Sequence, residues 1–116
     1  MATNQYMKRN KFNAQKQTYN GRSYHSKMEC NYAMELDWRI KAGEVKEWIS
    51  QYKLSLDVNG EHICNYYMDF KVILSDGSVE LHEVKGFETD LWRMKWRLTK
   101  ALLNEIEPGA KLVLIK

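Results

Sequence analysis

The sequence predicts one α/β domain, and three observations support this. Residues 26–42 and 90–106 carry apolar side chains at helical spacing. Four further segments are rich in β-branched and aromatic residues and are bounded by turn signals: 45–58, 61–74, 79–85 and 111–115. With 116 residues, of which 44% are hydrophobic and 28% charged, the chain has room for one core. The expected order is hairpin, α, β, β, β, α, β.

The first elements are marked by local signals. Asn20-Gly21 tolerates the positive φ angles of a tight turn, so it predicts a small hairpin before the first helix. Ser26 is a favourable N-cap for that helix, and Gly43 stands where a C-terminal cap is expected.

The next segments predict a run of antiparallel strands. Asn59-Gly60 separates the first two strands, and Ser75-Asp76-Gly77 separates the second from the third. A three-residue loop with Gly77 left-handed would pair Leu74 with Ser78, whereas a two-residue loop would shift the register by one.

Thr89 or Asp90 caps the second predicted helix, and Pro108-Gly109 ends it before the last strand. The helical wheel separates a basic stripe from two apolar stripes. The basic stripe could follow a phosphate backbone or be a solvated face: Arg93, Arg97 and Lys100. One apolar stripe is taken to face the sheet: Leu91, Met94, Leu98, Ala101 and Leu102. The other, in excess of what the sheet needs, is either a homodimer contact or packing beneath the hairpin: Trp92, Trp96 and Leu103.

Charge is distributed unevenly along the chain. Residues 1–28 hold six cations and no acid, so the total of +3 leaves −3 for the remainder. Residues 1–16 are expected to be a flexible basic arm that contacts phosphates through four cations: Lys8, Arg9, Lys11 and Lys16. A solvated terminus with no partner is the alternative.

The two cysteines lie far apart without metal-ligand spacing, which favours a reducing compartment. The sequence also has no long apolar segment and no signal-peptide pattern. A soluble, cytoplasmic protein without a membrane partner is therefore expected.

Asp69, Glu83 and Lys85 form the constellation most suited to chemistry. Asp69 and Glu83 fall on strands joined by a tight turn, and the three-residue loop would place them opposite each other. Carboxylates on adjacent strands are suitable ligands for Mg²⁺ or Mn²⁺. Lys85 lies two residues after Glu83, so it shares its face and could orient an attacking water.

Glu29 is the third candidate acid. It falls among the apolar positions of the first helix, so it is expected to point into the domain, where a cation would compensate its charge. The alternative is a capping box, in which the Glu29 carboxylate bonds to the backbone of Ser26.

Together these residues resemble a known superfamily. Glu29, Asp69 and Glu83-Val84-Lys85, in the order αβββαβ, are similar to the restriction-endonuclease-like superfamily with its PD-(D/E)XK motif. More narrowly, four segments resemble small phage-encoded Holliday-junction-resolvase-like endonucleases: residues 24–29, 51–53, 67–70 and 83–87. Met68 stands where the motif has proline, and Tyr52 where proline would follow Gln51.

The resemblance implies a nuclease domain over residues 17–116 with a mixed central sheet flanked by helices. Asp69 and Glu83 would hold Mg²⁺ or Mn²⁺, Glu29 would complete the metal site, and Lys85 would orient the water. Gln51 matches a glutamine near the site. The implied activity is hydrolysis of DNA phosphodiester bonds, with branched DNA as substrate and the host cytoplasm as location.

Two other function classes remain open from the sequence. One is a non-catalytic nucleic-acid-binding module on the same fold, in which the basic residues act and the acids do not. The other is a structural or host-interaction protein that uses the tryptophan stripe. DNA cleavage that depends on Mg²⁺ distinguishes both from an endonuclease.

Overall fold

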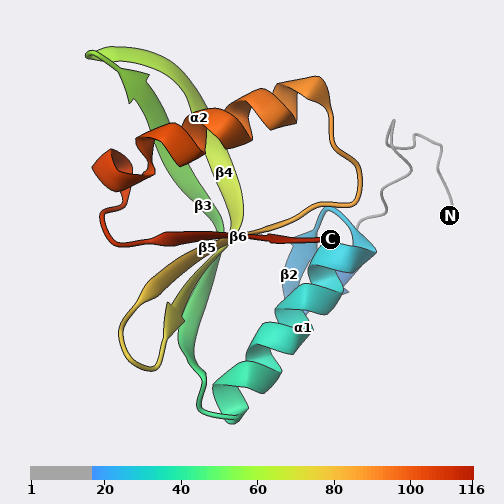
Figure 1. Cartoon of the computed structure of the whole chain (residues 1–116). Coiled ribbons are helices and arrows are strands. Elements are labelled where there is room, and N and C mark those ends of the chain that lie inside the picture. Colours follow the sequence, from blue (N-terminus) through green and yellow to red (C-terminus); the bar gives the residue numbers. More distant parts are fainter. Residues whose placement is uncertain (1–16) are drawn as a thin grey trace, which may run out of the picture.

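The structure, a computed structural model, describes residues 17–116 as a hairpin, two helices and a four-stranded sheet (Figure 1). The elements in chain order are β1 (Gln17–Tyr19), β2 (Arg22–Tyr24), α1 (Lys27–Lys41), β3 (Val45–Val58), β4 (Glu61–Leu74), β5 (Val79–Val84), α2 (Asp90–Ile106) and β6 (Lys111–Ile115). The sheet order is β3-β4-β5-β6, and the strands are antiparallel except for the parallel pair β5–β6. The chain is therefore α/β with a mixed sheet, as the sequence predicts.

Local signals define the ends of these elements. Asn20 and Gly21 both adopt positive φ, 54° and 81°, and turn β1 into β2. The Ser26 hydroxyl caps α1 by accepting a hydrogen bond from the Glu29 amide at 3.0 Å. Thr89 caps α2 in the same way through the Trp92 amide.

The register between β4 and β5 is the one that a three-residue loop predicts. Gly77 is left-handed at φ 89°, and the Leu74 amide donates to the Ser78 carbonyl at 2.8 Å. The strands then pair regularly as far as Phe70 and His82. Asp69 and Glu83 are next in this register, so the prediction that they are opposite each other on adjacent strands is confirmed.

The two helices pack on opposite faces of β5. His82 and Val84 point toward α1, where His82 contacts the Tyr32 hydroxyl, whereas Leu81 and Glu83 point toward α2. The buried face of α1 packs on the lower half of the β3–β4 hairpin, and α2 lies along its upper half (Figure 1).

The long β3–β4 hairpin changes its packing partner midway. Phe70 and Val72 belong to the core cluster of α1, whereas Tyr66 and Met68, at alternate positions of the same strand, belong to the cluster of α2. A long two-stranded ribbon twists strongly, which turns one face toward two different helices. The division falls at Asp69, where the two cores meet.

The predicted orientation of α2 is wrong in part. The tryptophan stripe packs on the sheet: Trp92 is buried against β3, β4 and β5, and Trp96 and Leu103 pack at the edge of the same cluster. The tryptophan stripe therefore neither packs beneath the β1–β2 hairpin nor forms an exposed surface for a homodimer contact. Leu91 and Met94, by contrast, are 62% and 68% exposed. Leu98 and Leu102 of the expected stripe do pack on this cluster, so the buried face of α2 combines parts of both stripes and is centred on the tryptophans.

None of the helices described within residues 17–116 is long and apolar enough to cross a membrane. Residues 1–16 lie outside the described part of the chain. The predicted phosphate contacts of the basic arm lie there too: Lys8, Arg9, Lys11 and Lys16.

Candidate active site

Three carboxylates and one lysine line a cleft between α1, the middle of β4 and the C-terminal end of β5. Glu29 comes from the first turn of α1, Asp69 from β4 and Glu83 from β5, and Lys85 follows β5 directly. Glu29 and Glu83 are only 5% and 4% exposed. The cleft measures about 370 Å³, and an adjoining cleft of about 310 Å³ shares Asp69, Glu83 and Lys85 with it. The residues singled out from the sequence therefore converge.

The side chains of Asp69 and Glu83 each accept a hydrogen bond from the backbone of the neighbouring strand, at the point where regular pairing of β4 with β5 ends. The Asp69 amide donates to Glu83 Oε1 at 3.3 Å, and the Val84 amide donates to Asp69 Oδ2 at 2.8 Å. Two side-chain bonds thus replace backbone pairing directly beyond Phe70 and His82. This local parting of β4 and β5 brings both carboxylates to the cleft.

Trp92 forms the wall behind Glu83, a role that the sequence does not reveal. Its indole N–H lies 3.1 Å from Glu83 Oε2 and 2.7 Å from the Tyr66 hydroxyl, to both of which it donates. The Lys85 ammonium lies 3.9 Å from Glu83 Oε2 and 5.1 Å from the centre of the Trp92 ring. Ion pairing and cation–π attraction therefore hold Lys85 over the acids. The Lys85 amide is anchored to the Ile115 carbonyl of β6 at 2.8 Å.

Glu29 forms only one of the two hydrogen bonds of a capping box. Ser26 does cap the Glu29 amide, but the Glu29 carboxylate points inward and accepts a hydrogen bond from the Gln51 amide at 3.2 Å. A hydrogen bond from the His25 backbone also favours its ionised form. The expectation that Glu29 faces the interior is confirmed by its burial.

Gln51 reaches the acids through an unusual backbone. It lies on β3 between the pairs Ser50–Phe70 and Tyr52–Met68, at the position that faces Asp69, and its φ is 53°. Left-handed backbone is unfavourable for a residue with a Cβ, and such strain is concentrated at functional sites. The side-chain amide donates to Glu29 and also stabilises ionised Asp69. The residue thus bridges α1 and β4 across the cleft.

Burial and mutual repulsion disfavour the ionised carboxylates. Burial raises the pKa of Glu29, and the nearby Glu83 raises it further. Burial raises the pKa of Asp69 to about 7, with Glu29 as the second cause. The pKa of Glu83 also rises to about 7, because of burial first and Asp69 second, while Lys85 opposes the shift. Without a further cation, the cleft holds more negative charge than its surroundings compensate.

The donor set fits a hard divalent cation. Carboxylate oxygens are the ligands that Mg²⁺ and Mn²⁺ prefer, and Mg²⁺ commonly uses one or two protein carboxylates and leaves its other positions to water and phosphate. Asp69 and Glu83 provide such a pair, with Glu29 beside them. Among residues 17–116, no three His, Cys, Asp or Glu side chains form a ready-made metal-binding group.

The predicted basic stripe of α2 lies on its exposed surface. Arg93, Arg97 and Lys100 are all exposed, but Arg93 is paired with Glu88 at 3.3 Å and with Asp90 at 3.0 Å. A role of this stripe in DNA binding stays a prediction.

The fold and the site define an α/β protein with a cleft of buried carboxylates and a lysine, placed where two strands of a mixed sheet part. Residues 9–109 match the model of the family described as "Protein of unknown function (DUF1064)". Since the match covers most of the chain, the protein belongs to DUF1064. No curated protein and no solved structure matches it significantly.

Proposed function

We propose that this protein is a metal-dependent DNA endonuclease of the restriction-endonuclease-like, PD-(D/E)XK superfamily, selective for branched DNA. One observation carries the proposal: Asp69 and Glu83, on adjacent strands, share a cleft with Lys85 two residues further on. The order α1, β3, β4, β5, α2, β6 supports it, because it is the αβββαβ order of that superfamily. The proposed place of action is the host cytoplasm, if the protein is encoded by a phage.

In this proposal Asp69 and Glu83 hold Mg²⁺ or Mn²⁺, and Glu29 completes the site. When bound, the ion supplies a Lewis acid for the scissile phosphate and a water of lowered pKa. Glu29 is already positioned by the Ser26 cap and the Gln51 amide. The side chains that would receive the cation are thus fixed before it arrives, which reduces the entropy lost on binding.

Lys85 is the residue that can act on the reacting groups. Its ammonium is held near Glu83 and above Trp92, so it can donate a hydrogen bond to an attacking water or to a phosphate oxygen. Trp92 and Tyr66 exclude water from the back of Glu83, which strengthens the electrostatic interactions in the cleft. Gln51 acts as a positioning residue for Glu29 and Asp69.

A cleavage assay with shaped substrates tests the proposal. Labelled linear, forked and four-way-junction DNA would be incubated with the protein in Mg²⁺ or in EDTA. We expect cleavage in Mg²⁺ only, with forked or four-way DNA cut faster than linear DNA. The Asp69→Asn variant, matched in size, should be inactive but folded. Cleavage in EDTA, or an active Asp69→Asn variant, would contradict the assigned site.

The second candidate function is a non-catalytic nucleic-acid-binding module. It is favoured by the structural bonds of the acids, since Asp69 and Glu83 each accept a backbone amide and could serve the fold alone. Binding of branched DNA without cleavage in Mg²⁺ or Mn²⁺ would select this alternative.

A further inference from the structure

We propose that Tyr67 and Phe87 are base-stacking residues, so that the cleft takes DNA whose bases are unpaired beside the scissile phosphate. This inference rests on the proposed function and specifies its substrate. The two rings line different clefts: Phe87 lines the cleft of about 370 Å³, and Tyr67 lines the adjoining cleft of about 310 Å³. Asp69, Glu83 and Lys85 line both clefts, so each ring shares a cleft with the acidic centre.

Both rings present large surface to the solvent. Phe87 is 58% exposed and Tyr67 is 50% exposed. Tyr67 lies two residues before Asp69 on β4, so alternation places it on the same face of the strand. Phe87 lies two residues after Lys85. Both rings are therefore accessible from the solvent, and each ring is close in sequence to a residue of the site.

Two lysines lie near Tyr67. Lys53 of β3 is its direct partner across the β3–β4 ladder, and paired residues of antiparallel strands share a face. Lys95 of α2 lines the cleft on the other side. Proteins that bind single strands combine such cations, which follow the phosphates, with aromatic rings on which bases stack.

Whether bases can stack on Tyr67 and Phe87 depends on whether the DNA is base-paired. In an intact duplex each base is stacked between its neighbours, so its faces are covered. Bases at a fork, a flap or a junction centre expose their faces and can stack on Tyr67 and Phe87. The inference therefore predicts a preference for unpaired DNA that depends on the two rings and not on the metal.

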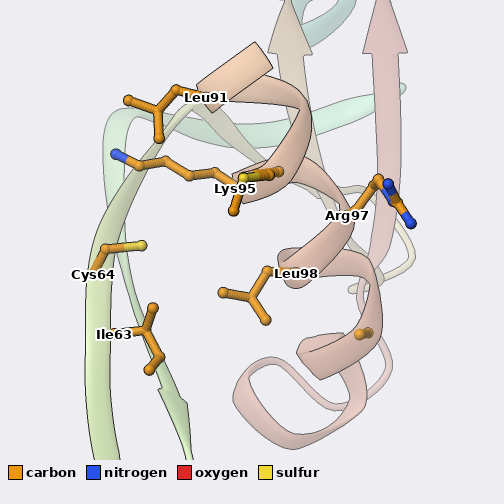
Figure 2. Close-up of a pocket in the computed structure, with 8 residues that line it drawn as sticks. Ile63, Cys64, Leu91, Lys95, Arg97 and Leu98 are labelled. Carbon is orange, nitrogen blue, oxygen red and sulfur yellow. The ribbon is translucent and has the colours of Figure 1, made fainter.

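The apolar groove beside the cleft is a separate feature. It measures about 580 Å³ and lies between α2 and β4, lined by Leu91, Leu98 and Ile63 among others (Figure 2). Leu91 and Lys95 border both this groove and the cleft of Tyr67. If the rings belonged to a protein interface continuous with this groove, their removal would not change DNA binding.

Binding in EDTA tests the inference without any cleavage. The probes are a fluorescein-labelled single-stranded DNA, a forked duplex and the fully paired duplex of the same sequence. Tyr67→Ala and Phe87→Ala should each weaken binding of the first two probes about tenfold and leave the paired duplex nearly unchanged. Tyr67→Phe and Phe87→Trp keep a ring and should bind like the wild type. Trp38→Ala removes a 67% exposed ring of α1 that lines neither cleft, and it serves as the matched control.

A base analogue gives a direct signature of stacking. Single-stranded DNA carrying 2-aminopurine should lose fluorescence on binding the wild type and Tyr67→Phe, but not on binding the double variant Tyr67→Ala/Phe87→Ala. Equal losses of affinity for paired and unpaired DNA, no loss in well-folded alanine variants, or no DNA binding by the wild type would each overturn the inference. Ring-dependent binding without cleavage in Mg²⁺ would uphold it and refute the nuclease instead.

Discussion

Glu83→Gln is expected to abolish cleavage and to change the pH dependence of stability in a defined direction. Glutamine has nearly the same size as glutamate, so the buried site needs no repacking. The substitution removes one negative charge beside Asp69 and one candidate metal ligand. Its effects on metal binding and on folding can therefore be measured separately.

The magnitude follows from the environment of Glu83. Burial and Asp69 raise its pKa from an ordinary 4.5 to about 7. Each pKa unit corresponds to about 1.4 kcal/mol, so the ionised side chain destabilises the metal-free protein by about 3 kcal/mol above pH 7. Because the folded pKa is the higher one, this destabilisation is absent below about pH 4 and grows as the pH rises toward 7.

The Glu83→Gln substitution removes the pH-dependent destabilisation, but glutamine has one hydrogen-bond acceptor atom fewer than glutamate. Only one of its two terminal atoms can accept, so the Asp69 amide or the Trp92 indole loses its bond to this side chain, at about 1–3 kcal/mol. Relative to the wild type, the variant should be less stable at pH 5 and of similar or greater stability at pH 8. The stability difference should shift by about 2–3 kcal/mol between these pH values.

Urea unfolding in EDTA at pH 5 and pH 8 measures this shift, and the same experiment in Mg²⁺ measures metal binding. At a concentration 100 times its Kd, the cation stabilises the wild type by about 2.7 kcal/mol, and it should stabilise Glu83→Gln much less. Cleavage of forked DNA is assayed on the same preparations. A well-folded variant that cleaves near the wild-type rate would refute the site, and a stability difference independent of pH would refute the electrostatic account.

Three further predictions concern the metal, the terminus and Gln51. Mg²⁺ or Mn²⁺ should support cleavage while Ca²⁺ supports binding only, because the larger ion positions the water poorly; equal rates in a metal titration would contradict this. Deletion of residues 1–16 removes four cations and should reduce the slope of log K against log salt by up to about 3.6, and an unchanged slope would mean that they make no phosphate contacts. Gln51→Gly removes the amide and suits φ 53°, so unfolding experiments should show equal or higher stability, by up to about 1 kcal/mol, with cleavage about 10–100-fold slower. Wild-type cleavage by Gln51→Gly would exclude the positioning role.

Most of the fold could be predicted because its signals are local. Asn20-Gly21, the Ser26 cap and Pro108-Gly109 act on neighbouring backbone, and the elements begin and end within a residue or so of the predicted positions. Even the pairing of β4 with β5 depends on a local feature, the left-handed Gly77. Once that register is set, the proximity of Asp69 and Glu83 follows from the chain alone.

The orientation of α2 could not be predicted because its amphipathic pattern allows two solutions. Leu91 and Met94 are as apolar as a core requires, yet they face the solvent because α2 is rotated so that Trp92 and Trp96 pack on the sheet beside Leu98 and Leu102. The choice depends on the shape of the β3–β4 hairpin, whose twist is a property of two strands together. No single helix sequence contains that information.

The same twist explains why Trp92 and the backbone of Gln51 were missed while the acids were found. The hairpin changes from the core of α1 to the core of α2 at Asp69, and Gln51 lies opposite this point on β3. Carboxylates buried at such a junction need partners from both sides, and they receive Gln51 with Glu29 on one side and Trp92 on the other. An acid in a strand can be recognised by its residue type, whereas an indole that donates to it is indistinguishable in sequence from an indole of the core. The charged residues of the site can therefore be predicted from the sequence, whereas the residues that position them can be identified only from the folded structure, in which the two cores meet.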